Sequence, residues 1–185
     1  VKEEEVEAAR GQLDPITFRQ EFEASFENLT GLVAVSFSDE NIDKEVADLH
    51  MLPLLLGLDF NVDPMAGICA VKHNNTLYVF DEIMLTGGAT TWDFAEEVVR
   101  RYGVDRRVIA CPDPTGSARK TSGVGVTDHT ILRRNGFTVM SPKSPWKIRD
   151  KMTAVNTALL DANGTRRTLI HPRCKELIKA LRTLT

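Results

Sequence analysis

Cysteine is scarce in this sequence, and its spacing excludes two kinds of stabilising site. The 185 residues contain three cysteines, Cys69, Cys111 and Cys174. An odd number without any Cys-x-x-Cys pair favours neither a disulfide framework nor a zinc site. Two of the three lie in apolar runs typical of strands, so we interpret the cysteines as small buried residues of a protein from a reducing compartment.

Long hydrophobic runs, a signal-peptide pattern, internal repeats and low-complexity segments are also absent. We therefore expect no membrane partner. Apolar residues make up 42% of the chain and charged residues 26%, as in ordinary soluble globular proteins. At this length we expect one domain, or one domain with an extension.

Three familiar site motifs are broken or missing. In the run 116–121, Arg119 stands where a Walker A loop needs glycine before its Lys-Thr pair, which excludes a nucleotide-hydrolysing motor. The run 59–63 begins like a calcium loop, but Pro64 and Ala70 replace the required glycine and glutamate. The four histidines are scattered and form no nucleophile motif with serine or cysteine, so acyl-transfer chemistry has no support.

The charges are distributed unevenly along the chain. Residues 1–53 hold 13 acidic and 4 basic side chains, whereas residues 54–185 hold 13 acidic and 19 basic ones. An excess of basic side chains is expected in a protein that binds the phosphates of a polyanion. Basic residues that are simply solvated on helix surfaces would give the same count.

Apolar runs and the turns between them predict an α/β fold with a mixed sheet. We expect hairpins to join the first three strands and a helix to lead from the third strand to the fourth. This helical crossover lets the fourth strand lie parallel to the first and beside it. The expected strands are 54–60, 66–72, 76–83, 107–111, 137–140 and 167–171. We expect one helix to start at Pro15 and another to start at Thr90. The other expected helices span 41–51, 127–134, 147–161 and 172–181.

We interpret residues 1–52 as an acidic lead-in that packs on a core formed by residues 53–185. Two apolar stripes at helical spacing are expected to be buried. The first lies in the lead-in and consists of Phe18, Phe22 and Phe26. The second lies in the helix 147–161 and consists of Ile148, Met152, Val155 and Leu159.

Two aspartates lie where predicted strands end. Asp59 is at the end of the run 54–60, and Asp113 follows the run 107–111 between two prolines that hold it stiffly. A carboxylate at the end of a buried strand is costly to desolvate, and two carboxylates side by side also repel each other. A divalent cation resolves both problems, so we predict a metal-dependent phosphoryl-transfer site with Asp59 and Asp113 as catalytic metal ligands.

Other side chains are assigned supporting roles. Asn61 and Asp63 are expected to orient Asp59 or a metal-bound water, unless their segment is a plain hairpin turn. Asp81 and Glu82 are consecutive on a strand and face opposite sides, so one of them, Glu82 in our assignment, leans toward the site. The candidates for contacts with nucleic-acid phosphates are Arg119, Lys120, Lys147, Arg149 and Lys151.

Five segments occur in an order that one protein family shares. They are Phe18–Phe26, Leu58–Pro64, Val79–Ile83, Cys111–Gly116 and Ala154–Leu160, and the resemblance that they carry extends over nearly the whole chain. This set resembles the nuclease domain of the large terminase subunit of tailed bacteriophages. The resemblance implies a ribonuclease H-like fold and a DNA endonuclease that uses Mg2+ or Mn2+. It assigns Asp59 as the first-strand metal ligand and Asp113 as the fourth-strand ligand, around two ions about 3.5–4 Å apart.

The resemblance also implies a biological setting. The substrate would be concatemeric double-stranded viral DNA, cut when packaging starts and when the head is full. The implied partners are the terminase motor domain, the small terminase subunit and the portal, in the host cytoplasm and transiently at the procapsid. The motor domain has no counterpart in this sequence, and neither Asp150 nor Asp161 has the context of the third family acid. We therefore expect a fragment whose two acids bind metal weakly.

Two other functions would use the same fold differently. An actin-like or sugar-kinase-like half would bind Mg-ATP through the two acids, but it needs glycine-rich phosphate hairpins where this chain has Asn61 to Pro64. A non-catalytic DNA-binding or assembly module would keep the acids as structural remnants. Stabilisation by Mn2+ separates that module from a nuclease.

Overall fold

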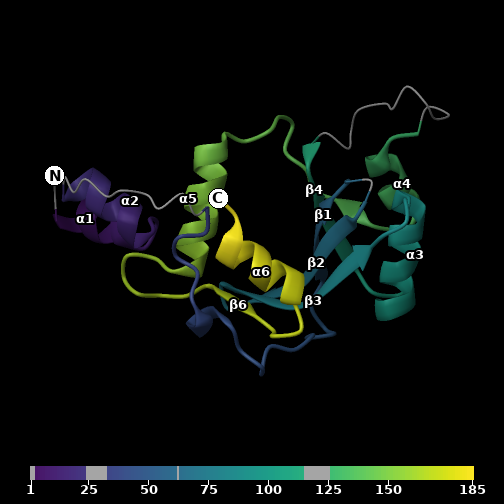
Figure 1. Ribbon diagram of the computed structural model, residues 1–185, viewed down its shortest axis with the longest axis horizontal. Coiled ribbons are helices and arrows are strands. Elements are labelled where there is room, and N and C mark those ends of the chain that lie inside the picture. Colours follow the sequence, from purple (N-terminus) through teal and green to yellow (C-terminus); the bar gives the residue numbers. More distant parts are fainter. Residues whose placement is uncertain (1–2, 24–32, 62, 115–125) are drawn as a thin grey trace. The chain divides into compact units, whose positions relative to one another are not determined.

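The computed structural model describes residues 3–23, 33–61, 63–114 and 126–185 (Figure 1). Along the chain, the elements are α1 Glu3–Arg10, α2 Pro15–Phe22, a 3-10 turn Asp39–Asn41, β1 Leu54–Asp59, β2 Met65–His73, β3 Thr76–Leu85, α3 Thr91–Tyr102, β4 Val108–Pro112, α4 Asp128–Arg134, β5 Thr138–Val139, α5 Ile148–Leu159, β6 Thr168–Ile170 and α6 Lys175–Thr183. Within these ranges, no helix combines the length and the apolar character that crossing a bilayer requires.

The strands of the described chain form one six-stranded sheet in the order β5-β4-β1-β2-β3-β6. β1 pairs with β2 in antiparallel orientation and with β4 in parallel orientation, and β4 is parallel to β5. The predicted mixed α/β sheet is therefore confirmed. So is the parallel pairing of the first and fourth strands, with α3 as the helical crossover that such a connection needs.

The chain divides into two compact units. The α5–α6 unit contains residues 1–46, 73–78 and 146–185, and the β1–β4 unit contains residues 47–72 and 79–145. Asp59 and Asp113 both belong to the β1–β4 unit. The domain boundary that we predicted at residue 53 stays a prediction.

Helix α3 forms as the sequence predicts and covers one face of the β1–β4 sheet (Figure 1). It begins with a capping box, in which the Asp93 carboxylate accepts from the Thr90 backbone N–H at 2.7 Å. Its end is Gly103, whose positive φ of 88° suits glycine. The Phe94, Ala95 and Val98 side chains are fully buried, as are Leu54 and Leu56 of β1. This apolar layer fixes β1 and leaves its other face for the site.

Gly67 of β2 allows α3 to lie close to the sheet. A Cβ atom at this position would lie 2.5 Å from Cζ of the buried Phe94 and 3.1 Å from the Gly57 carbonyl oxygen. We expect Gly67→Ala to lower the free energy of unfolding by about 1–3 kcal/mol, because neither neighbour can move freely. Urea unfolding followed by circular dichroism measures the change.

A matched control for this variant is Gly11→Ala, because a methyl group there would lie 3.5 Å from an Asn163 side-chain atom and 3.9 Å from the Ala8 carbonyl oxygen. Both contacts are of ordinary length, and removing glycine also lowers the entropy of the unfolded chain. We therefore expect Gly11→Ala to leave the stability unchanged or slightly higher. Equal losses in the two variants would contradict a close approach at Gly67.

The helix predicted over 41–51 is wrong. The structure has only the 3-10 turn Asp39–Asn41, followed by irregular chain. The reason is Asn41, whose fully buried amide group donates to the Leu159 carbonyl at 2.9 Å and the Thr168 carbonyl at 3.0 Å. These bonds anchor the segment to α5 and β6, and Ile42 then bridges to Ile170 in parallel orientation.

The two predicted apolar stripes are confirmed only in part. Phe18 of α2 is buried and stacks on Phe22 at 5.0 Å, whereas Phe22 itself is exposed and Phe26 lies outside the described residues. In α5, Leu159 is buried, but Ile148 and Val155 are exposed. The buried side of α5 instead carries the polar residues Asn156 and Thr157.

Candidate metal site

The candidate metal site is formed where β1 and β4 end. The two strands pair in register from Leu54 opposite Val108 to Leu58 opposite Pro112. Asp59 is the last residue of β1, and Asp113 directly follows the last residue of β4. The two aspartates are therefore the next residues after the last matched pair, at the carboxyl ends of neighbouring parallel strands. This is the end of an α/β sheet where ligands usually bind.

Strand alternation, continued one residue past β4, assigns both aspartates to the same face of the sheet. Leu58 and Pro112 are buried, whereas Asp59 is exposed and Asp113 is half-buried. Because side chains alternate along a strand, the residues after a buried pair point to the opposite side. Cys111 lies on this side too and is exposed, which corrects our interpretation of it as a buried residue. Cys69 and Cys174 are buried, and burial raises the pKa of the Cys69 thiol to about 12.

The residues after β1 hold Asp59 in place. The Asn61 side-chain amide donates to Asp59 Oδ2 at 2.7 Å, which leaves Oδ1 as the carboxylate oxygen outside this bond. Asp63 Oδ1 accepts from the Gly87 backbone N–H at 3.2 Å. Asn61 therefore contacts the candidate ligand directly, whereas Asp63 joins the turn after β1 to the turn after β3.

Asp81 and Glu82 of β3 differ in their surroundings. The Asp81 carboxylate accepts from the Tyr102 hydroxyl at 2.7 Å and from Arg101 Nη1 at 3.1 Å, both on α3. The Asp81 carboxylate therefore joins β3 to α3. Strand alternation directs the partly exposed Glu82 to the side opposite Asp81. β2 separates β3 from β1, so Glu82 is one strand further from Asp59 than Asp113 is.

The donor atoms of the site fit a hard divalent cation. Two carboxylates from adjacent strand ends offer only oxygen ligands, which Mg2+ and Mn2+ prefer over the sulfur and imidazole ligands of zinc sites. Among the described residues, however, no group of three or more His, Cys, Asp or Glu side chains is suited to hold a metal. The described part of the chain thus offers a pair of acids and not a complete cage.

His129 is a residue of this site that sequence reasoning missed. It lies in the first turn of α4, is only 4% exposed, and its Nε2 is 3.1 Å from the Asp113 carbonyl oxygen. Its ring also contacts Phe60, the residue after Asp59, at a centroid distance of 5.9 Å. The only sequence signal is that His129 precedes the buried Leu132 by three residues and so shares its helix face.

The candidate phosphate-binding residues come from two segments of the chain, and only one of these segments is described. Arg119 and Lys120 lie outside the described residues. Lys147 and Lys151 are exposed near the start of α5. Arg149 donates to Glu21 at 3.0 Å, so its charge is already paired at the surface.

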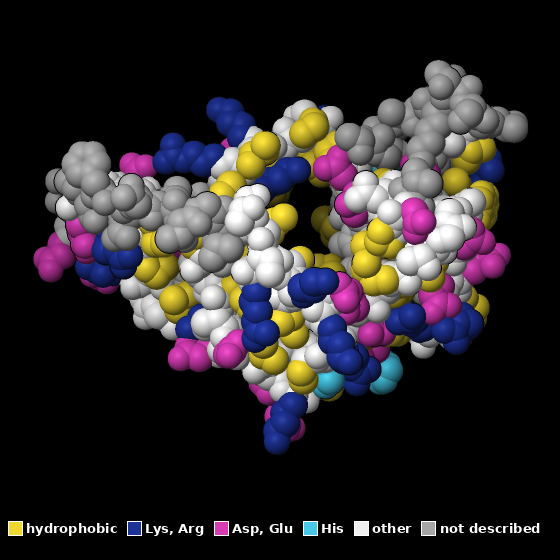
Figure 2. Space-filling view, in the orientation of Figure 1, with side chains coloured by type: hydrophobic (Ala, Val, Ile, Leu, Met, Phe, Trp, Pro, Cys, Tyr) yellow, Lys and Arg dark blue, Asp and Glu magenta, His cyan; other side chains and the backbone are white. Residues whose placement is uncertain are grey.

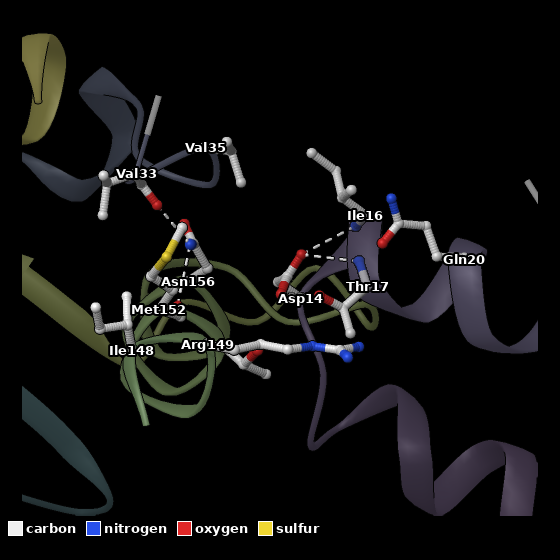
Figure 3. Close-up of a pocket in the computed structure, with 11 residues that line it drawn as sticks. Asp14, Ile16, Thr17, Gln20, Val33, Val35, Ile148, Arg149, Met152 and Asn156 are labelled. Atoms are coloured by element: carbon white, nitrogen blue, oxygen red, sulfur yellow. Dashed lines mark hydrogen bonds between the residues drawn. The ribbon is translucent and has the colours of Figure 1, made fainter. Parts of the chain in front are cut away.

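Arg149 also lines a cavity of about 460 Å³ between α2 and α5 (Figure 3). Its side chain extends from α5 toward Asp14 and Thr17. The Asp14 carboxylate caps α2, because it accepts from the Ile16 and Thr17 backbone N–H groups at 3.1 and 3.0 Å. With its acid used as a helix cap, this cavity offers no acid pair like that of Asp59 and Asp113.

Basic side chains that we did not select also gather over α6 (Figure 2). Lys175, Lys179 and Arg182 recur at four- and three-residue spacing, so they follow one side of the helix. They line a groove of about 410 Å³ together with Ile42 and Pro172. Arg182 is bonded to Asp39, so part of this charge is already compensated.

Comparison with known proteins gives matches among solved structures. No protein-family model matches the sequence, and curated proteins give no significant match. The large terminase of a thermophilic bacteriophage matches with a TM-score of 0.71 and 15% identity, over 99% of this chain and 44% of that one. The P22 large terminase nuclease domain matches with a TM-score of 0.60 and 14% identity, over 83% of this chain and 78% of that one.

Two further terminase nuclease structures match with lower scores. The nuclease domain from bacteriophage SPP1, with bound Mn, has a TM-score of 0.47, and that from the thermophilic phage G20c, with bound magnesium, has 0.49. The present chain spans less than half of the thermophilic phage's large terminase and most of the P22 domain. The resemblance predicted from the five sequence segments is confirmed by the fold: the chain has the ribonuclease H-like architecture of terminase large-subunit nuclease domains.

Proposed function

We propose that this chain is a metal-dependent DNA endonuclease domain of a phage DNA-packaging terminase. The observation that supports the proposal most directly is the parallel register of β1 and β4, which brings Asp59 and Asp113 to one end and one face of the sheet. The fold shared with the P22 nuclease domain supports the same reaction class. The substrate is double-stranded viral DNA, cut in the host cytoplasm and at the procapsid.

In this proposal, the protein's own residues hold the two carboxylates in the positions that metal binding requires. Asp59 and Asp113 hold Mg2+ or Mn2+ through carboxylate oxygens, and Asn61 fixes the orientation of Asp59. Pro112 and Pro114 limit the backbone around Asp113, so its carboxylate keeps its direction. A bound pair of ions would supply an activated water and stabilise the departing 3′ oxygen of the phosphodiester. Asp63 and Glu82 act as supporting acids at the rim of the site.

The partners follow from the same proposal. The motor domain, the small terminase subunit and the portal belong to the packaging assembly in which such a nuclease works. For contacts with DNA phosphates, we propose the exposed Lys147 and Lys151, together with Arg119, Lys120 and Arg149.

The test is incubation of the purified chain with supercoiled plasmid in Mn2+, Mg2+ or EDTA. We expect nicked and linear products with Mn2+, fewer with Mg2+, and none with EDTA. Mn2+ should also raise the melting temperature, since a ligand at 100 times its dissociation constant adds about 2.7 kcal/mol of stability. Gel electrophoresis and thermal unfolding measure the two effects. The proposal would be contradicted if Mn2+ produced no cleavage and no stabilisation at every concentration tested.

One observation favours a second candidate function, a non-catalytic DNA-binding or assembly module. The described residues offer two acids and no third group beside them, and a site of two carboxylates holds metal weakly. Such a module would bind DNA equally well in Mn2+ and in EDTA, and would leave the plasmid supercoiled in both.

A further inference from the structure

We propose that His129 is a positioning residue that holds the two acid-bearing strand ends at a fixed separation. This inference rests on the proposed metal site and adds a residue to it. His129 does not come from either acid-bearing strand. It comes from α4, which begins at Asp128 after the cap residue Thr127.

The imidazole of His129 contacts both strand ends at once. Its Nε2 is 3.1 Å from the carbonyl oxygen of Asp113, and a carbonyl oxygen only accepts, so Nε2 carries the hydrogen and donates it. The ring lies 5.9 Å from the Phe60 ring at an interplanar angle of 43°. One buried side chain thus touches the backbone of one acid and the residue next to the other.

Strand alternation assigns these contacts to the face opposite the carboxylates. Phe60 follows Asp59 and alternates to the other side of β1, which is the side that packs on the helices. His129 is 4% exposed there. It therefore reaches neither DNA nor a metal ion on the carboxylate face, and it can act only by fixing where Asp59 and Asp113 stand.

The start of α4 also makes a second contact, which does not involve the His129 side chain. Asp128, the residue before it, is buried and accepts from the Thr91 hydroxyl at 2.7 Å. Thr91 is the first residue of α3, so the bond joins the first turns of the two helices. This bond joins α4 to α3, and neither of its two residues belongs to β1 or β4. It therefore provides a control that separates positioning from stability.

The experiment measures Mn2+ affinity by isothermal titration calorimetry on the whole chain, with stability in EDTA measured in parallel. His129→Phe keeps an aromatic ring beside Phe60 but removes the donor to Asp113. We expect it to weaken Mn2+ binding by about 10–100-fold, the usual effect of losing a group that orients a metal ligand. His129→Gln, whose amide nitrogen can still donate to the same carbonyl, should recover most of that loss.

Thr91→Val is the matched control. It removes the bond to Asp128, so it lowers the unfolding free energy, yet the proposal requires its Mn2+ affinity to stay within about twofold of the wild type. The inference is overturned by wild-type affinity in His129→Phe, by no recovery in His129→Gln, or by an equal loss in Thr91→Val. Failure of the proposed nuclease gives a different result. The wild type would then bind no Mn2+, or it would bind Mn2+ that the Asp59→Asn substitution does not remove.

Discussion

Replacing either Asp59 or Asp113 by asparagine abolishes Mn2+-dependent plasmid cleavage, if the acid pair is the metal site. Each substitution removes one of two carboxylates from neighbouring strand ends. The loss of several kcal/mol of charge stabilisation corresponds to roughly 100-fold or more in rate. Initial rates of supercoiled plasmid loss, measured at saturating Mn2+, give the size of the effect.

The same substitutions leave the fold intact, and this separates a catalytic from a structural effect. Asparagine is close in shape to aspartate, and its side-chain oxygen still accepts from the Asn61 amide in place of Asp59 Oδ2. Removing one of two neighbouring negative charges also relieves repulsion. We therefore expect melting temperatures in EDTA equal to or above that of the wild type.

Asp105→Asn is the matched control, because Asp105 is exposed in the turn that leads into β4, at the opposite end of that strand from Asp113. It changes the net charge by the same amount and should leave cleavage unchanged. Equal cleavage by the wild type and both site variants would identify a contaminating nuclease or a different site.

Much of the β1–β4 unit could be predicted from the sequence because its signals are local. A capping box at Thr90 and a glycine at 103 bound α3, and apolar runs mark β1 and β4. A helix between two strands then allows parallel pairing, and strand alternation decides the face on which Asp59 and Asp113 lie. None of these steps needs knowledge of distant residues.

The sequence failed where buried polar side chains decide the structure. The Asn156 amide of α5 donates to the Val33 carbonyl at 2.8 Å and accepts from the Ser36 N–H at 3.0 Å, partners more than 100 positions away. These bonds turn Asn156 inward, so Val155 faces out although the apolar stripe predicted the reverse. Hydrophobic periodicity considers only apolar residues. It therefore does not predict the burial of an amide side chain whose hydrogen-bond partners come from distant parts of the chain.

Asp161 is a buried acid, and its contacts assign it to folding. It is 1% exposed, its Oδ1 accepts from the Asn163 and Thr165 backbone N–H groups at 3.0 and 2.9 Å, and its Oδ2 accepts from Arg167 Nη1 at 2.7 Å. Arg167 in turn donates to the Gly11 carbonyl at 3.0 Å. The pair therefore joins the end of α5 to the turn after α1.

We expect Asp161→Ala to lower the free energy of unfolding by about 3–5 kcal/mol, because it leaves the Arg167 charge without its partner in a largely buried position. In a domain of this size, that loss shifts the melting temperature by roughly 10 °C. Differential scanning calorimetry measures it. Asp150→Ala, an exposed acid on α5, is the control and should change stability by no more than about 0.5 kcal/mol.

The same variant also separates a structural acid from a third metal ligand. Both oxygens of Asp161 are occupied by N–H donors of its own unit. We therefore expect Asp161→Ala to cut plasmid at the wild-type rate at temperatures where it is fully folded. A folded variant that had lost Mn2+-dependent cleavage would contradict this assignment, since it would place Asp161 among the metal ligands with Asp59 and Asp113. A variant as stable as Asp150→Ala would instead show that the bonds to Arg167 and the two backbone N–H groups add little to folding.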